Sequence, residues 1–152
     1  MKKKLLSLFY LLFPLIIGFI VSLIIKDYID YSTLLKPPLA PPKVLFPIAW
    51  TIIYLLLGIS FYLYKKNTQR KDWFIDFTYY TNLVINALWS IIFFVLKWRL
   101  VAVIWIIILL LNLISLISLF LKKNPPSAYL NTIYLLWTIF ATYLTIGIYI
   151  LN

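Results

Sequence analysis

Residues 37–58 read PPLAPPKVLFPIAWTIIYLLLG, a proline-rich half followed by an apolar half. Five prolines fall within residues 37–47, and because each proline fixes its own φ and removes an amide donor, this half cannot be helical. It is predicted to be a stiff, extended loop. A loop of this kind at the mouth of a helix bundle is typical of a lid or a binding loop, and the alternative is a plain proline-rich spacer.

The apolar half belongs to one of five long uncharged runs. The chain has 152 residues, of which 64% are hydrophobic and 12% charged, and this composition excludes a water-soluble globular domain. About 20 apolar residues cross a bilayer as a helix. We therefore predict an all-α integral membrane protein, a single bundle of five transmembrane helices over residues 1–152 with the proline-rich loop as a lid. The predicted helices cover residues 5–25, 44–64, 77–96, 100–121 and 128–151.

The charged residues mark the loops and the orientation. The chain carries 14 Lys and Arg against 4 Asp and Glu, but these lie between the apolar runs and form no continuous basic groove, so no nucleic acid partner is predicted. Five crossings place the termini on opposite faces of the membrane. Nine of the 14 basic residues fall on the side of the N-terminus, which predicts an N-terminus in the cytoplasm and a location in the cytoplasmic membrane.

The residue types also limit the chemistry. The chain has no His and no Cys, so zinc sites, disulfides, thiolate nucleophiles and imidazole bases are excluded, and no metal or resident cofactor is predicted. No ionisable residue lies inside the five predicted spans, which argues against an ion or proton pump.

The third run has one polar and aromatic face. Asn82, Asn86, Trp89, Ser90 and Phe93 recur at spacings of three and four, so they share a side of the helix. An amide in hydrocarbon is costly unless it is paired, and this face is therefore predicted to point into the bundle.

Aromatic side chains at the same depth in two other helices converge on that face. Residues 44–64 and 128–151 each carry a Trp and a Tyr within two turns, next to a small residue. A polar group among convergent aromatics is typical of a small-molecule pocket, and ordinary core packing is the alternative. The candidate pocket residues are Trp50, Tyr54, Asn86, Trp89, Phe93, Tyr134, Trp137 and Ala141.

These residues carry a resemblance to a known family. The stretch at 37–58 resembles the signature of the translocator protein family, also called the tryptophan-rich sensory protein or peripheral-type benzodiazepine receptor family. Three further segments agree with its motifs in the same order: Tyr31, Leu34 and Lys36-Pro37 in the loop, NALWS with a following FF at 86–94, and YLLW with FA at 134–141. The matches span nearly the whole chain.

The resemblance implies a ligand and an assembly. It implies a five-helix bundle in the lipid bilayer, often a homodimer, whose cavity opens toward the first loop and binds porphyrins and other flat aromatic molecules. By motif position, the cavity would be lined by Trp50, Asn86, Trp89, Trp137 and Ala141, with Tyr31, Ala40 and Pro41 in its lid. Three positions depart from the family pattern, namely Asp30 in place of Trp, Ile133 in place of Pro and Thr145 in place of Asn, so the lid and rim contacts are expected to differ.

Three functions are compared. The first is a membrane receptor or sensor for porphyrin-type tetrapyrroles. The second, implied by the resemblance, is a light- and oxygen-dependent porphyrin-degrading enzyme with Trp50 and Trp137 as its catalytic residues. The third is a transporter of tetrapyrroles or sterols, or a scaffold, but five spans without internal repeats are a poor match for a carrier.

Overall fold

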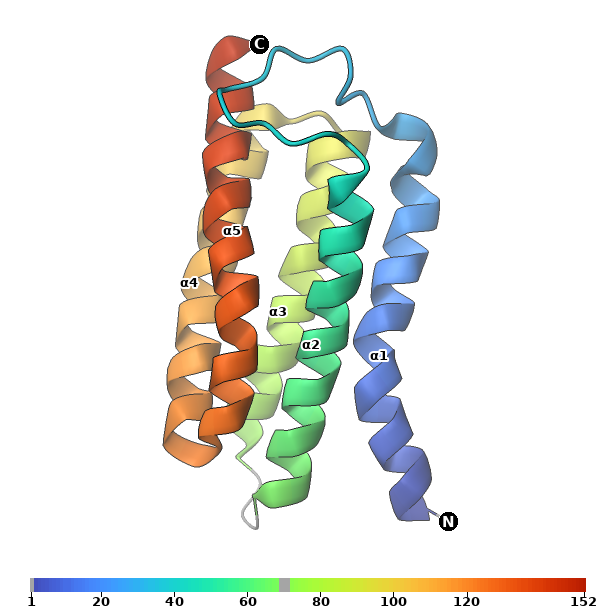
Figure 1. Ribbon diagram of the computed structural model, residues 1–152, viewed down its shortest axis with the longest axis vertical. Coiled ribbons are helices and arrows are strands. Elements are labelled where there is room, and N and C mark those ends of the chain that lie inside the picture. The colour runs from blue at the N-terminus through green and yellow to red at the C-terminus, as the bar shows by residue number, and fades with distance from the viewer. Residues whose placement is uncertain (1, 69–71) are drawn as a thin grey trace.

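Five long helices form the whole of the fold, and a computed structural model describes them over residues 2–68 and 72–152 (Figure 1). They are α1 (Lys2–Ile25), α2 (Leu45–Asn67), α3 (Trp73–Ser90), α4 (Arg99–Lys123) and α5 (Pro125–Leu151). A short 3-10 helix, η1 (Lys26–Tyr28), follows α1, and a π-helical turn, η2 (Ile91–Val95), extends α3. Five segments are long and apolar enough to cross a membrane, so the predicted five-helix membrane bundle is confirmed.

The helices pack in a closed ring. The backbones approach one another most extensively in the order α1, α2, α5, α4, α3 and back to α1. Helices α4 and α5 have the most extensive contact, as their tight connection predicts. The N- and C-termini lie at opposite ends of the bundle, and the loop between η1 and α2 runs across the C-terminal end (Figure 1).

Helix α3 begins four residues earlier than predicted, at Trp73. The carboxylate of Asp72 caps this start by accepting a hydrogen bond from the Phe74 amide at 3.0 Å. One turn on, Asp76 forms an ion pair with Lys65 of α2, whose side chain is only 8% exposed. Of the two acidic residues that suggested a loop, Asp72 therefore caps the helix and Asp76 is paired with a lysine of another helix.

Helix α1 is the least buried of the five, since only 11% of its apolar span is buried inside the bundle. It is held close to α2 at Gly58, where an added Cβ would lie 2.2 Å from the backbone oxygen of Leu11. Gly58 therefore serves the close approach of two helices.

The interior divides into two clusters. One surrounds Phe61 and Tyr79, whose rings stack at 3.8 Å between centroids, and extends toward the N-terminal end. The other surrounds Trp89 and Phe93 under the first loop. Trp50 packs against both clusters, so it lies at their boundary.

Candidate functional site

A pocket with a free volume of about 20 Å³ lies beneath the first loop. Its wall comes from the loop, from the start of α2, from the end of α3 with η2, and from the last turns of α5. The lining residues are Tyr31, Phe46, Trp89, Phe93, Phe94, Ala141, Leu144, Thr145 and Ile148. Most of this surface is apolar and much of it is aromatic, which suits a flat apolar ligand.

The aromatic rings of the wall support one another. Trp89 stacks on Phe93 with 5.4 Å between ring centroids, and Phe94 meets Phe93 edge-on at 4.9 Å. On the loop side, Tyr31 meets Phe46 edge-on at 4.9 Å. The rings therefore form two supported faces rather than single mobile side chains.

Two indole groups near the pocket have no hydrogen-bond acceptor. The Nε1 atoms of Trp89 and Trp137 are buried, and neither has a partner in the described part of the chain. By contrast, the indole of Trp105 donates to the backbone oxygen of Ile85 at 2.9 Å. A buried donor without an acceptor costs free energy, so both groups indicate where an acceptor of a ligand would be stabilised.

The polar residues below the pocket satisfy one another. Tyr54 donates to the amide oxygen of Asn86 at 3.0 Å, and the Asn86 amide nitrogen donates to the Tyr134 hydroxyl at 2.6 Å. Tyr134 in turn donates to Asn82 at 3.1 Å, and Asn82 donates to Asn112 at 2.9 Å. This five-residue chain, the amide network, joins α2, α3, α4 and α5. Asn82 and Asn86 are fully buried, which confirms that the polar face of α3 points inward.

The predicted site residues fall into three groups. Those that line the pocket are Tyr31, Trp89, Phe93 and Ala141. Those in the amide network are Tyr54, Asn86 and Tyr134. The remaining ones lie beside the wall or in the loop, namely Trp50, Trp137, Ala40 and Pro41.

The third group supports the wall from outside. Trp50 lies between Tyr54 and Trp89, with 6.1 and 6.0 Å between ring centroids. Trp137 meets Phe46 edge-on at 6.0 Å. In the loop, the backbone oxygen of Pro41 accepts a hydrogen bond from Tyr31 at 2.9 Å.

Five lining residues were missed by the sequence analysis. Phe46 lies one helical turn before Trp50, and Phe94 directly follows Phe93. Leu144, Thr145 and Ile148 follow Ala141 at spacings of three, four and seven. That spacing is the signal that could have identified them, because it places them on one face of α5.

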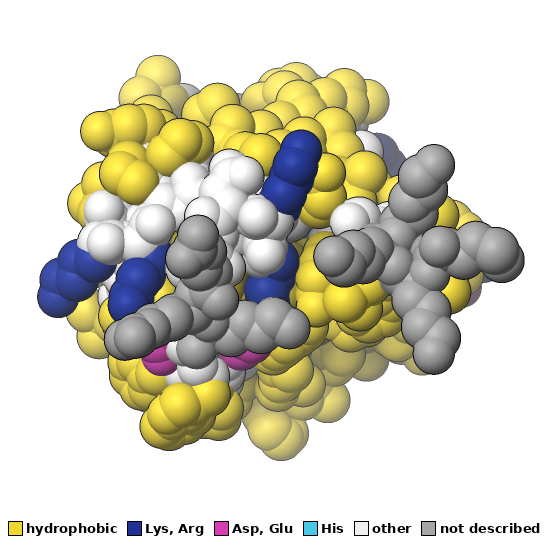
Figure 2. All heavy atoms as spheres, turned by 90° about the horizontal axis from the view of Figure 1, so that it is seen from below, with side chains coloured by type: hydrophobic (Ala, Val, Ile, Leu, Met, Phe, Trp, Pro, Cys, Tyr) yellow, Lys and Arg dark blue, Asp and Glu magenta, His cyan; other side chains and the backbone are white. Residues whose placement is uncertain are grey.

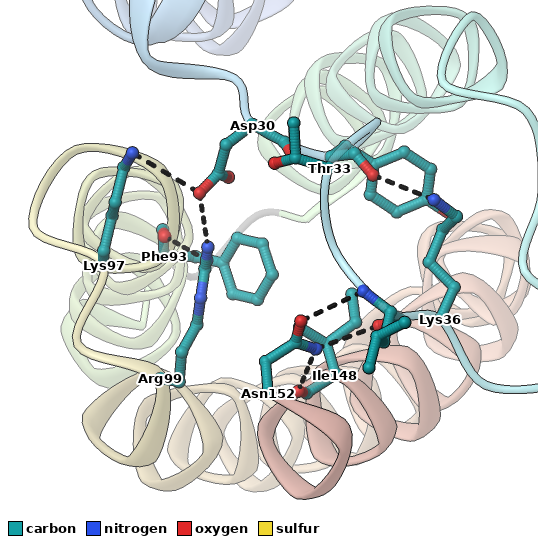
Figure 3. A network of polar contacts seen from close by, with 10 residues as sticks. Asp30, Thr33, Lys36, Phe93, Lys97, Arg99, Ile148 and Asn152 are labelled. Atoms are coloured by element: carbon teal, nitrogen blue, oxygen red, sulfur yellow. Dashed lines mark hydrogen bonds and ion pairs between the residues drawn. The ribbon is translucent and has the colours of Figure 1, made fainter.

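The loop is closed over the pocket by polar contacts at its rim (Figure 3). On the α4 side, Asp30 pairs with Arg99 at 2.8 Å and with Lys97 at 3.4 Å. On the α5 side, the Asn152 amide exchanges two hydrogen bonds with the backbone of Leu35, at 3.0 and 2.9 Å.

Two further contacts hold the middle of the loop. Tyr143 donates to the backbone oxygen of Pro38 at 2.6 Å. The ammonium of Lys36 donates to the backbone oxygens of Tyr31 and Leu34. Tyr31 itself is buried beneath the loop, and this burial raises the pKa of its hydroxyl above the usual value of 10.0, so the hydroxyl stays a hydrogen-bond donor at neutral pH.

The wall provides binding contacts rather than acid–base groups. Within residues 2–68 and 72–152, no three metal-ligating side chains lie together, and the only hydroxyls on the wall are those of Tyr31 and Thr145. Thr145 donates to the Ala141 backbone oxygen at 2.7 Å. What the wall offers a ligand is therefore ring stacking and indole hydrogen bonds.

Comparison with known proteins places these features in a family. The model of the TspO/MBR family matches residues 10–151. The "Tryptophan-rich protein TspO" of Archaeoglobus fulgidus is 37% identical over 122 residues, which cover 80% of this chain and 79% of that protein. The protein of the same name from Bacillus cereus is 29% identical and covers 100% of this chain and 99% of its own. A "Tryptophan-rich sensory protein" of Cereibacter sphaeroides is 28% identical over 74% of this chain and 70% of its own.

Proposed function

The chain belongs to the TspO/MBR family of membrane sensory proteins, and on that premise we propose that its pocket binds porphyrin-type tetrapyrroles and other flat aromatic ligands within the bilayer. The observation that carries the proposal is the Trp89 indole. It is buried in the pocket wall, stacked on Phe93, and lacks an acceptor among the described residues. A planar macrocycle would stack on these rings and supply an acceptor at its edge.

Binding of so large a ligand would require the loop to move. As it stands, the pocket has a free volume of about 20 Å³, enough for about one water molecule and far below the roughly 300–1,000 Å³ of small-molecule sites. The loop is not part of a helix, and it is held by hydrogen bonds and ion pairs at its rim. We therefore assign residues 29–44 the role of a lid, with Tyr31, Ala40 and Pro41 as its ligand-facing part.

The proposed ligand can be tested by titration in darkness. Protoporphyrin added to the purified full chain in lipid nanodiscs would quench tryptophan fluorescence, because Trp50, Trp89 and Trp137 surround the pocket. Saturable quenching at one ligand per chain is the expected result. Quenching that rises linearly with protoporphyrin, as partition into lipid would give, would contradict the proposal.

A second candidate function is the light- and oxygen-dependent degradation of bound porphyrin. It is favoured by the ring contact of Trp50 with Trp89, at 6.0 Å, and by the free indole N–H of Trp137. Dioxygen would be the oxidant: it would accept the electrons that the photoexcited porphyrin loses, and the indoles would relay these electrons and return to their starting state. Loss of the porphyrin absorbance in air and light, but not in Trp50→Phe or Trp137→Phe, would support this function. Recovery of unchanged porphyrin after illumination would leave a receptor.

The membrane and the orientation are also part of the proposal. Figure 2 looks onto the N-terminal end of the bundle and shows several basic side chains there, in dark blue. Lys66 in the last turn of α2 and Lys122 and Lys123 in the last turn of α4 are exposed. Arg70 and Lys71, which the charge count also includes, lie outside the described residues. This bias supports a cytoplasmic N-terminus in the cytoplasmic membrane.

The orientation can be tested with engineered cysteines, because the chain has no native one. In intact bacterial cells, Thr33→Cys in the lid would react with an impermeant maleimide and Lys123→Cys would not. The reverse pattern would place the lid in the cytoplasm. The homodimer implied by the family resemblance stays a prediction, which light scattering of the detergent-solubilised protein would test.

A further inference from the structure

A guanidinium group lies against Phe93, a residue that lines the pocket (Figure 3). Arg99 is the first residue of α4, and its side chain is 14% exposed. It lies over the ring of Phe93, a wall residue, at 4.3 Å from the ring centroid. One of its terminal nitrogens, Nη1, donates to the backbone oxygen of Phe93 at 2.6 Å. These contacts hold the cation against the pocket wall, where a bound ligand would reach it.

The other terminal nitrogen is paired with an acid from the lid. Nη2 of Arg99 lies 2.8 Å from Oδ2 of Asp30, and the Lys97 ammonium lies 3.4 Å from the same oxygen. The second carboxylate oxygen of Asp30, Oδ1, is buried and has no hydrogen-bond partner in the described part of the chain. Asp30 is thus held at a cationic site in which only one of its two oxygens is satisfied.

The cationic site is formed by the turn between η2 and α4. Lys97 adopts a left-handed backbone conformation, with φ of 56°. The backbone amides of the next two residues, Trp98 and Arg99, donate hydrogen bonds to backbone oxygens that precede them in the chain. The turn presents both cations toward the lid, whereas the acid comes from a segment 69 residues earlier in the chain.

We propose that Arg99 is the recognition site for a carboxylate of the ligand, and that Asp30 occupies this site in the closed state. The proposal rests on the function proposed above, and it specifies that the preferred ligand is a flat aromatic molecule with a carboxylate at its edge, such as the propionate of a porphyrin. Entry of that carboxylate displaces Asp30 and releases the lid on the α4 side.

The exchange is energetically balanced. A carboxylate that replaces another carboxylate on Arg99 keeps the cation paired, so no buried charge is left uncompensated. The displaced Asp30 returns to water, which satisfies the oxygen that lacks a partner in the closed state. The neutral hydrogen bonds of Asn152 and Tyr143 keep the lid attached to α5 meanwhile.

Two forms of one porphyrin test this inference. Protoporphyrin has two carboxylates, and its dimethyl ester has none but keeps the same ring. Both would be titrated, in darkness and in nanodiscs, against the wild type, Asp30→Asn, Arg99→Gln and the double variant. Asp27→Asn is the matched control for Asp30→Asn, because Asp27 is exposed on η1 and its change removes the same charge three residues away. Lys122→Gln, at the far end of α4, is the corresponding control for Arg99→Gln.

We expect Asp30→Asn to strengthen binding of the diacid about tenfold, because a hydrogen bond to a charged group contributes about that factor. The affinity for the ester should stay within about twofold of the wild-type value. The Arg99→Gln variant should bind the diacid and the dimethyl ester with equal affinity. Equal shifts for diacid and ester in Asp30→Asn, or a diacid preference that survives in Arg99→Gln, would overturn the inference. If Arg99→Gln fails to fold because Asp30 keeps only Lys97 as a partner, the double variant replaces it, since the charges of Asp30 and Arg99 are then both absent.

The same titrations separate this inference from the proposed function. If both porphyrins bind saturably but no variant changes their ratio, the tetrapyrrole pocket stands and the role of Arg99 is wrong. If neither form binds saturably to any variant, the proposed function fails and the inference fails with it.

Discussion

The amide network and the pocket wall lie one above the other in the same bundle, yet they differ in whether their buried polar groups have hydrogen-bond partners. In the network, Asn86 uses its oxygen for Tyr54 and its nitrogen for Tyr134, each on a different helix. At the pocket, the indole of Trp89 in the wall and that of Trp137 beside it are buried, and neither has an acceptor among the described residues. The network is complete without a ligand, and the wall is not. Buried polar residues in this protein can therefore be divided into structural and ligand-directed ones by whether a neighbour already satisfies them.

The largest expected effect comes from breaking the network. Asn86→Leu removes two buried hydrogen bonds and leaves the Tyr54 hydroxyl unpaired, so the free energy of unfolding should fall by about 2 to 3 kcal/mol. Unfolding by SDS in mixed micelles, followed by tryptophan fluorescence, measures this change. Asn67→Leu at the exposed end of α2 is the control and should stay within about 0.5 kcal/mol of the wild type. Equal stability of Asn86→Leu and the wild type would mean that the network is not structural.

The next effect compares an indole donor that lacks an acceptor with one that has an acceptor, by the same substitution made at two positions. Trp89→Phe removes a donor without an acceptor, so it should weaken protoporphyrin binding about tenfold while stability changes little. Trp105→Phe removes a donor that already bonds to Ile85, so it should lower stability by about 1 kcal/mol and leave the affinity unchanged.

Porphyrin titration and SDS unfolding of both variants measure this difference. The distinction between polar groups that have a partner and those that lack one would fail if Trp105→Phe weakened binding as much as Trp89→Phe. It would also fail if Trp89→Phe destabilised the fold while its affinity stayed at the wild-type value.

The smallest expected effect concerns the lid. An added Cβ at Gly147 would lie 2.6 Å from the side chain of Pro37, so Gly147→Ala should displace the loop slightly at its α5 side. We expect faster ligand association, by about twofold to threefold, and a loss of stability below about 1 kcal/mol. Stopped-flow quenching measures the rate. An unchanged rate together with an unchanged fold would show that the lid does not limit entry.

The fold could be predicted because it depends on local sequence. Uncharged runs of about 20 residues fix the helices, and the prolines at 37–47 fix the position of the lid. Helices α1 and α5 begin three residues earlier than predicted, and α2 ends three residues later. The largest error in helix bounds, at the start of α3, arose because Asp76 was taken as a loop residue. Its partner Lys65 belongs to another helix, and a pairing across helices leaves no periodic signal in either segment.

The site was only partly predictable for the same reason. Trp89, Phe93 and Ala141 were found because each lies on a helical face with a clear spacing. The π-helical turn of η2, which brings Phe94 to the wall beside Phe93, has no such signal, nor has the pairing of Asp30 with Arg99 across 69 residues. Whether an indole or an amide already has a partner depends on the neighbouring helices, and this is what assigns Asn86 to the network and Trp89 to the wall.

Helix α1 contributes no residue to the amide network, which ties the other four helices together, and it meets α2 at the close approach of Leu11 to Gly58. During biogenesis, the four tied helices can therefore reach their final arrangement first, with α1 docking onto a preformed surface. In the mature protein α1 should be the unit that detaches at the lowest free energy, and its amides should exchange with solvent deuterium before those of α3. The N-terminal segment would then also be the part most readily replaced by a separately synthesised copy of itself.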